Sequence, residues 1–100
     1  MFSHVVIFWT DPKQPNAAQE LIDGAHRYLK NIPGADFFHV GRMATSDRPG
    51  VDQSYQVALN IAFKDKATQD AYQVHEDHVK FVEEIFKRVC KKVTVYDFEG

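Results

Sequence analysis

The segment Ser54-Tyr55-Gln56-Val57-Ala58-Leu59-Asn60-Ile61-Ala62-Phe63-Lys64 decides the fold class of this 100-residue chain. Successive side chains of a β-strand point to opposite faces, so the segment places large apolar residues on one face and small or polar residues on the other. We therefore predict a strand over residues 54–64. Its bulky face carries Val57, Leu59, Ile61 and Phe63.

Three other segments also have strand character. Residues 3–10 alternate with both faces largely apolar, which predicts a strand that is covered by a helix on one face and by a second subunit on the other. Residues 35–43 form another candidate, followed by the polar loop 46–50. Residues 92–98 alternate as the last strand.

Helical spacing fills the first gap between these strands. Residues 16–31 place their apolar side chains on one face, with Asn16 as the expected N-cap and residues 31–34 as the stop. Gly24 lies in the middle of this helix, where glycine costs about 1 kcal/mol relative to alanine.

The second helical region has two parts. Asp65 is a suitable N-cap for a short helix that runs to about His75, and residues 78–89 continue helically. The resulting order, β-α-β-β-α-β, is the ferredoxin-like arrangement. We therefore predict one α+β domain over residues 1–100, with a four-stranded antiparallel sheet. The residues expected to point inward from the second part are Val79, Val82, Ile85, Phe86 and Val89.

Composition sets the scale of the molecule and the classes of partner. Hydrophobic residues make up 44% and charged residues 26% of the chain, which describes one soluble globular domain. At this size folding hides only about 60–65% of the extended chain's surface, so an exposed apolar sheet face favours a homodimer. The formal charge of −2 gives no bulk attraction to nucleic acid.

Cys90 is the only cysteine, which excludes an intrachain disulfide and fits a reducing compartment. No basic segment precedes a long apolar run, and residues 5–9 are too few to span a bilayer. We expect a cytoplasmic protein with no membrane partner.

The segment from Tyr72 to Phe81 carries the clearest chemical signal, because it gathers two imidazoles and a phenol. Histidine gains or loses a proton near neutrality, and a nearby tyrosine donates or accepts a hydrogen bond. These groups can perform acid–base chemistry without a cofactor. In an uninterrupted helix Tyr72 and His78 would point in different directions, so we expect the helix to bend, with Asp77 as the N-cap of its restart.

Sheet residues on the bulky face are the candidate walls of a pocket. His4 and Asp97 are polar groups at the ends of otherwise apolar rows, and each of them needs a partner. His4 is either a hydrogen-bonded residue at the sheet end or part of the pocket wall. The candidate ligand-binding residues are His4, Val6, Phe8, Val57, Leu59, Ile61, His75, Phe81, Val93, Val95 and Asp97.

A metal centre has little support in the sequence. His75 and His78 supply two ligands at most, no HExxH motif is present, and Glu76 and Asp77 point away from a shared helical face. Cys90 has no histidine close in sequence and is interpreted as a packing residue. We predict neither a metal nor a cofactor.

The pattern as a whole resembles the stress-responsive dimeric α/β-barrel (Dabb) family. The resemblance covers nearly the whole chain, and its most specific block is Tyr72-x-x-His75-x-x-His78-Val79-x-Phe81. It implies a homodimer in which two four-stranded sheets form a barrel, with a cavity between the helices and the sheet of each subunit. The matching segments are residues 4–8, 31–34, 55–63, 72–81 and 95–98, and the face expected to meet the second subunit carries Trp9, Ala58, Asn60 and Ala62.

The resemblance also implies a reaction. In plant polyketide cyclases of this family, the residues that match Tyr72 and His78 form the catalytic pair. By similarity, His78 removes a proton next to a carbonyl group while Tyr72 holds the developing oxyanion. This chain departs from those cyclases at Ala25, Val57 and Glu76, where they have a pocket tyrosine, a pocket histidine and commonly a helix-bending proline.

Three functions are therefore compatible with the sequence. The first is cofactor-free cyclase or lyase chemistry on a small apolar or carbonyl-containing ligand, with Tyr72 and His78 as the catalytic pair. The second is a non-catalytic ligand-binding or stress protein, and the third is a cofactor-free monooxygenase-like protein, which fold analogy alone suggests.

Overall fold

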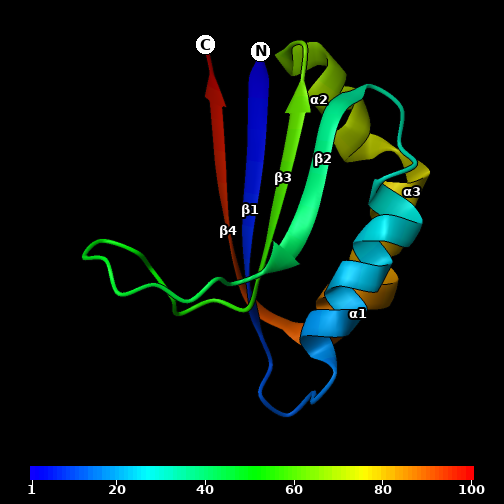
Figure 1. Ribbon diagram of the computed structural model, residues 1–100. Helices are drawn as coiled ribbons and strands as arrows, with labels where there is room; N and C mark the ends of the chain where they lie inside the picture. The colour runs from blue at the N-terminus through cyan, green and yellow to red at the C-terminus, as the bar shows by residue number, and fades with distance from the viewer.

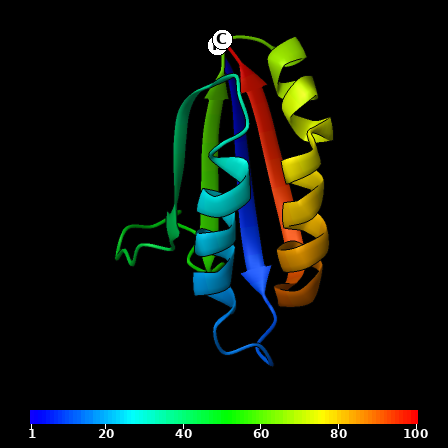
Figure 2. The same ribbon diagram turned by 90° about the vertical axis from the view of Figure 1, so that its right-hand side faces the viewer.

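Four antiparallel strands form one sheet, and all helices of the computed structural model, which describes residues 1–100, cover the same face of it (Figures 1 and 2). The strand order is β2-β3-β1-β4, so the first strand lies in the middle beside the third. This is the predicted ferredoxin-like arrangement. The strands are β1 (Phe2–Thr10), β2 (Ala35–Arg42), β3 (Val57–Phe63) and β4 (Cys90–Glu99).

The predicted bulky strand is present, but it is shorter than expected. Residues 54–56 belong to the preceding loop, where the Ser54 backbone N–H donates to the Asp52 carboxylate at 2.8 Å. The core of the domain lies on the bulky face. Its strand residues on β1 and β3 are Phe2, Val6, Phe8, Val57, Leu59, Ile61 and Phe63, all buried.

The first helix begins as predicted and changes character halfway. Its regular part α1 (Ala17–Gly24) continues into the π-helical segment η1 (Ala25–Leu29), after which the Lys30 backbone N–H donates to the Ala25 carbonyl. Asn16 occupies the N-cap position, but its side chain makes no capping hydrogen bond.

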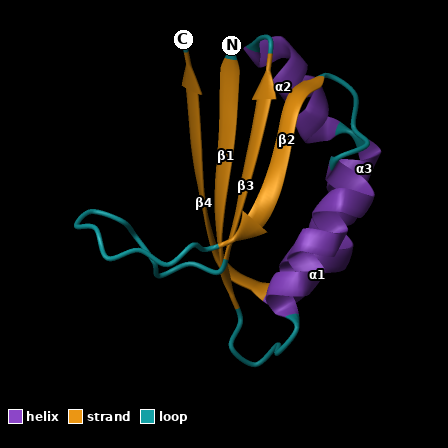
Figure 3. Cartoon of the chain, viewed as in Figure 1, coloured by secondary structure: helices purple, strands orange, loops and turns teal.

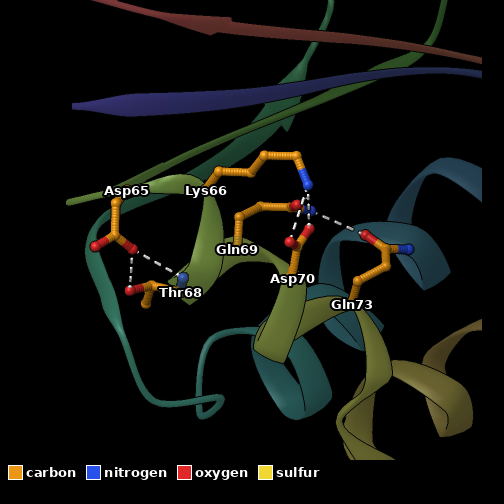
Figure 4. A network of polar contacts seen from close by, with 6 residues as sticks. All are labelled: Asp65, Lys66, Thr68, Gln69, Asp70 and Gln73. Carbon is orange, nitrogen blue, oxygen red and sulfur yellow. Dashed lines mark hydrogen bonds and ion pairs between the residues drawn. The ribbon is translucent and has the colours of Figure 1, made fainter.

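The second helical region consists of four pieces: α2 (Lys66–Val74), α3 (Glu76–Phe81), η2 (Val82–Phe86) and α4 (Lys87–Val89). Asp65 caps α2 as predicted, because its carboxylate accepts the Thr68 backbone N–H at 2.9 Å (Figure 4). The prediction for Val79 is wrong, since it is 50% exposed. The break before α3 gives the inward position to Phe81, which is buried.

The other face of the sheet carries no helix. It exposes large apolar side chains, with Phe37 at 51%, Tyr96 at 59% and Phe98 at 60% exposure. The loop of residues 43–56 projects from the sheet on the side away from the helices (Figures 1 and 3). No helix in the structure combines the length and the apolar character needed to cross a lipid bilayer.

Gly24 is explained by close packing between the two helical regions. A Cβ atom at this position would lie 2.9 Å from Ile85 Cγ1, closer than van der Waals contact allows. The glycine therefore lets α1 approach η2, which offsets its poor helix propensity.

We predict that Gly24→Val destabilises the fold by about 1–3 kcal/mol through overpacking against Ile85. Urea unfolding of Gly24→Val, Ile85→Ala and the double variant forms a double-mutant cycle. The expected coupling between the two positions is at least about 0.5 kcal/mol, because Ile85→Ala removes the atoms that a side chain at position 24 would clash with. Strictly additive effects would contradict this packing explanation.

Candidate active site

A cavity of about 420 Å³ lies between the helices and the sheet. It borders the edge strand β4, where Val93 and Val95 are 40% and 46% exposed although they point toward the helical side. The residues that line it are His4, Val6, Phe8, Leu29, Leu59, Gln69, Tyr72, Gln73, His78, Phe81, Val82, Phe86, Val93, Val95 and Asp97.

The cavity has a polar end and an apolar end. Strand pairing puts His4 beside Asp97 at one end of the sheet and Phe8 beside Val93 toward the other. Helix α2 brings its polar side chains to the first end, whereas Phe86 packs edge-on against Phe8, with ring centroids 6.1 Å apart, at the second. A ligand that matches this wall has a polar head and an apolar body.

The expected break between Tyr72 and His78 is present, but its cap is a different residue. His75 has extended backbone angles (φ −62°, ψ 144°), and its ring Nδ1 accepts the Asp77 backbone N–H at 3.0 Å. Asp77 therefore supplies the capped N–H and is not the cap. The new helix α3 turns His78 toward Tyr72, and the ring centroids of the two residues lie 5.1 Å apart at an interplanar angle of 77°.

Tyr72 is almost completely buried, with 2% of its surface exposed. Its hydroxyl is the one buried side-chain polar atom in the chain without a hydrogen-bond partner. Burial raises the pKa of the phenol above its ordinary value, so the group is protonated near neutral pH and is able to donate a hydrogen bond. A buried donor without a partner costs about 1–3 kcal/mol, which is unusual for a purely structural residue.

His78 has the complementary property. Burial lowers the pKa of its imidazole, and the nearby His4 lowers it further. The ring is therefore neutral near pH 7 and able to accept a proton. A neutral base and a protonated phenol stand in contact at the polar end of the cavity.

His4 and Asp97 are partners of each other. They face each other across β1 and β4, and His4 Nδ1 lies 2.6 Å from Asp97 Oδ1. His4 is 5% exposed and still lines the cavity, and its ring centroid is 5.8 Å from that of Tyr72. His4 therefore makes a hydrogen bond at the end of the sheet and also forms part of the cavity wall.

Three of the candidate ligand-binding residues lie outside the cavity. Val57 and Ile61 have no exposed surface, because the helices pack directly over them in the core. His75 serves as the N-cap of α3 and does not reach the cavity wall.

Sequence reasoning also missed five lining residues. Gln69 lies one helical turn before both Tyr72 and Gln73 on α2, a spacing that could have indicated that the two glutamines lie near Tyr72. Val82 and Phe86 were predicted to point inward but not to line the pocket. Leu29 belongs to the apolar face predicted for the helix over residues 16–31.

The structure also bears on the two other chemical possibilities considered above. No group of three or more potential metal ligands converges in the chain. Burial raises the pKa of the Cys90 thiol to about 11, so the sulfur stays protonated and behaves as a packing group.

A ferredoxin-like sheet with helices on one face and a partly polar cavity between the layers defines the class of this protein. The chain belongs to the Dabb family, since the model of the stress responsive A/B barrel domain matches residues 2–100. No functionally curated protein matches the chain at a significant level.

Solved structures share this architecture over nearly the whole chain. A Dabb family protein from Mesorhizobium loti is 26% identical, with a TM-score of 0.77, and the match covers 99% of this chain and 95% of that one. A protein from Arabidopsis thaliana is 26% identical, with a TM-score of 0.79 and coverage of 100% and 95%. A dimeric ferredoxin-like protein of unknown function from Thermobifida fusca is 18% identical, with a TM-score of 0.79 and coverage of 99% and 90%.

We predict that stability falls as the pH drops below about 6.5, in part because of His78. Its pKa is lower in the folded chain than in the unfolded chain, so protons bind the unfolded state first and favour it. Urea unfolding between pH 7.5 and 5.0 should show a smaller loss of stability for His78→Gln than for the wild type. His26→Gln, a change at an exposed histidine on η1, should keep the wild-type slope, and equal slopes for all three proteins would contradict the assignment.

Proposed function

We propose that this protein is a Dabb-family enzyme that performs cofactor-free acid–base chemistry on a small carbonyl compound with an apolar body. The observation that carries the proposal is the unpartnered hydroxyl of Tyr72, buried beside His78. The Tyr72 hydroxyl can donate a hydrogen bond to the oxygen of a ligand, and the neutral imidazole of His78 can accept a proton.

The chemical steps follow from these two groups. His78 takes a proton from the carbon next to the carbonyl group, and the electron pair left behind moves onto the carbonyl oxygen. Tyr72 donates a hydrogen bond to that oxygen as its negative charge develops. In a cyclisation the enolate carbon attacks a second carbonyl group, and the alkoxide formed there takes the proton from the imidazolium. In an exchange reaction the enolate carbon takes a proton back from the imidazolium.

The shape of the cavity supports an amphipathic substrate. Carbonyl recognition belongs to the polar end with Tyr72, His78 and His4, and the apolar wall around Phe8 and Phe86 suits an alkyl or aryl body. The non-catalytic ligand-binding function uses the same cavity and is distinguished only by the absence of turnover. The monooxygenase-like alternative rests on the shared fold, and no residue of the cavity favours it.

The test is deuterium exchange at the α-carbon of a medium-chain alkyl methyl ketone, followed by proton NMR in D₂O. We predict that the wild type accelerates exchange and that Tyr72→Phe reduces the acceleration by about 10²–10³-fold. Because the hydroxyl has no partner, Tyr72→Phe should keep or slightly raise the free energy of unfolding.

His78→Gln should abolish the same acceleration, whereas His26→Gln should leave it intact. Buffer-level exchange in the wild type, together with thermal stabilisation by the ketone, would assign the cavity to ligand binding without catalysis.

The proposal includes a homodimer joined through the helix-free face of the sheet. The support is the exposed aromatic residues at both edges of that face, Phe37 on β2 and Tyr96 and Phe98 on β4, and the dimeric state of the ferredoxin-like protein from Thermobifida fusca. Exposure of such an apolar face to water is unfavourable, and a second copy of the chain covers it symmetrically.

We predict that analytical ultracentrifugation of the wild type gives twice the monomer mass of 11.5 kDa. The double variant Tyr96→Glu/Phe98→Glu should sediment as a monomer, because four carboxylates would face each other across the interface. Val79→Glu changes an exposed apolar residue on the helical side and should remain dimeric. A monomeric wild type would refute the interface.

A further inference from the structure

Two glutamine side chains connect the inner wall of the cavity to His78. Gln69 is 5% exposed, and its Nε2 donates to Gln73 Oε1 at 3.0 Å (Figure 4). Gln73 Nε2 in turn lies 3.3 Å from His78 Nε2. All three residues line the cavity.

This chain of contacts crosses the break between the two helices. Gln69 and Gln73 are one turn apart on α2, whereas His78 belongs to α3, which starts after the extended residue His75. The contact between Gln73 and the His78 ring therefore links α3 to α2 across the break. Gln73 is the only side chain that hydrogen-bonds to the His78 ring.

Hydrogen-bond chemistry gives the contact a direction. The amide nitrogen of glutamine only donates, so the ring nitrogen opposite it must accept. A neutral imidazole with an accepting Nε2 carries its proton on Nδ1. The contact as it stands therefore matches a His78 ring with its proton on Nδ1.

We propose that Gln73, held in place by Gln69, is a positioning residue that fixes His78 in the Nδ1-protonated form and keeps Nε2 as its proton acceptor. A ligand that enters the cavity displaces the Gln73 amide from its long, exposed contact with the ring. The ligand then faces the electron pair on His78 Nε2. The catalytic meaning of this arrangement rests on the proposed function, whereas the ring tautomer does not.

The other titratable groups around His78 leave this role to Gln73. Tyr72 from α2 packs edge-on against the ring without a hydrogen bond to it, and His4 from β1 is engaged with Asp97 of β4. None of them supplies a donor to a nitrogen of His78 in this structure.

The experiment is long-range ¹H–¹⁵N NMR of the histidine rings in the ¹⁵N-labelled full chain, recorded at a pH where His78 is neutral. The wild type should show a protonated Nδ1 and an unprotonated Nε2 for His78. Gln73→Glu keeps the shape but offers only acceptor atoms, so the proton should move to Nε2 and the titration midpoint should rise by about one pH unit.

Gln73→Met and Gln69→Met complete the set. The first removes the donor and the second removes its anchor, so both should give a mixture of the two tautomers, more strongly for Gln73→Met. The ring signals of His39, which lies on the helix-free face of the sheet, should be the same in all four proteins.

A wild-type His78 with its proton on Nε2, or a Gln73→Glu protein with an unchanged ring, would overturn the proposal. These readouts need no substrate, so they are separate from the fate of the proposed function. The proposed function fails if the wild type does not accelerate deuterium exchange, whereas the positioning role fails on the ring spectrum of His78.

Discussion

The interruption at His75 is the constraint on which the site depends. A continuous helix would carry Tyr72 and His78 in different directions, and only one of them would face the sheet. The extended backbone at His75 and the N–H of Asp77 bonded to its ring redirect the chain within one residue. Many proteins use proline for such a bend, whereas here a side-chain cap performs the task.

The three ring side chains at the polar end of the cavity differ in their hydrogen-bond partners. His4 has a carboxylate at 2.6 Å, His78 has an amide at 3.3 Å, and Tyr72 between them has no partner. Burial pushes the pKa of His78 down and that of Tyr72 up, so both groups are uncharged near neutrality. Proton abstraction next to a carbonyl group requires a neutral base and a nearby hydrogen-bond donor.

The open edge of the helical layer also has a structural origin. The helices pack directly over the large residues of β3, which leaves Val57 and Ile61 sealed in the core. Beside the outer strand β4 they leave space, and Val93 and Val95 remain partly exposed there. The sheet therefore supplies core on the β3 side of β1, where Leu59 alone reaches the cavity, and cavity wall on the β4 side. Both β3 and β4 have alternating sequences, so alternation does not distinguish them.

Local periodicity was sufficient to predict the order of the strands and helices, the bulky face of the sheet, the cap at Asp65 and the need for a bend between Tyr72 and His78. It was wrong about Asp77 and Val79, because a break of one residue rotates everything after it. It could not tell Val57 and Ile61 from Leu59, since alternation fixes the face of a side chain but not whether a helix lies over it.

The sequence by itself determined the layer architecture, because two-residue and helical periods are properties of neighbours along the chain. Only the tertiary structure decided that His4 meets Asp97, that the Tyr72 hydroxyl stays without a partner and that Gln73 reaches His78. The first contact depends on strand register, which joins residues far apart in the sequence. The other two depend on the direction of α3, which follows from the backbone angles of His75, and side-chain patterns do not encode those angles.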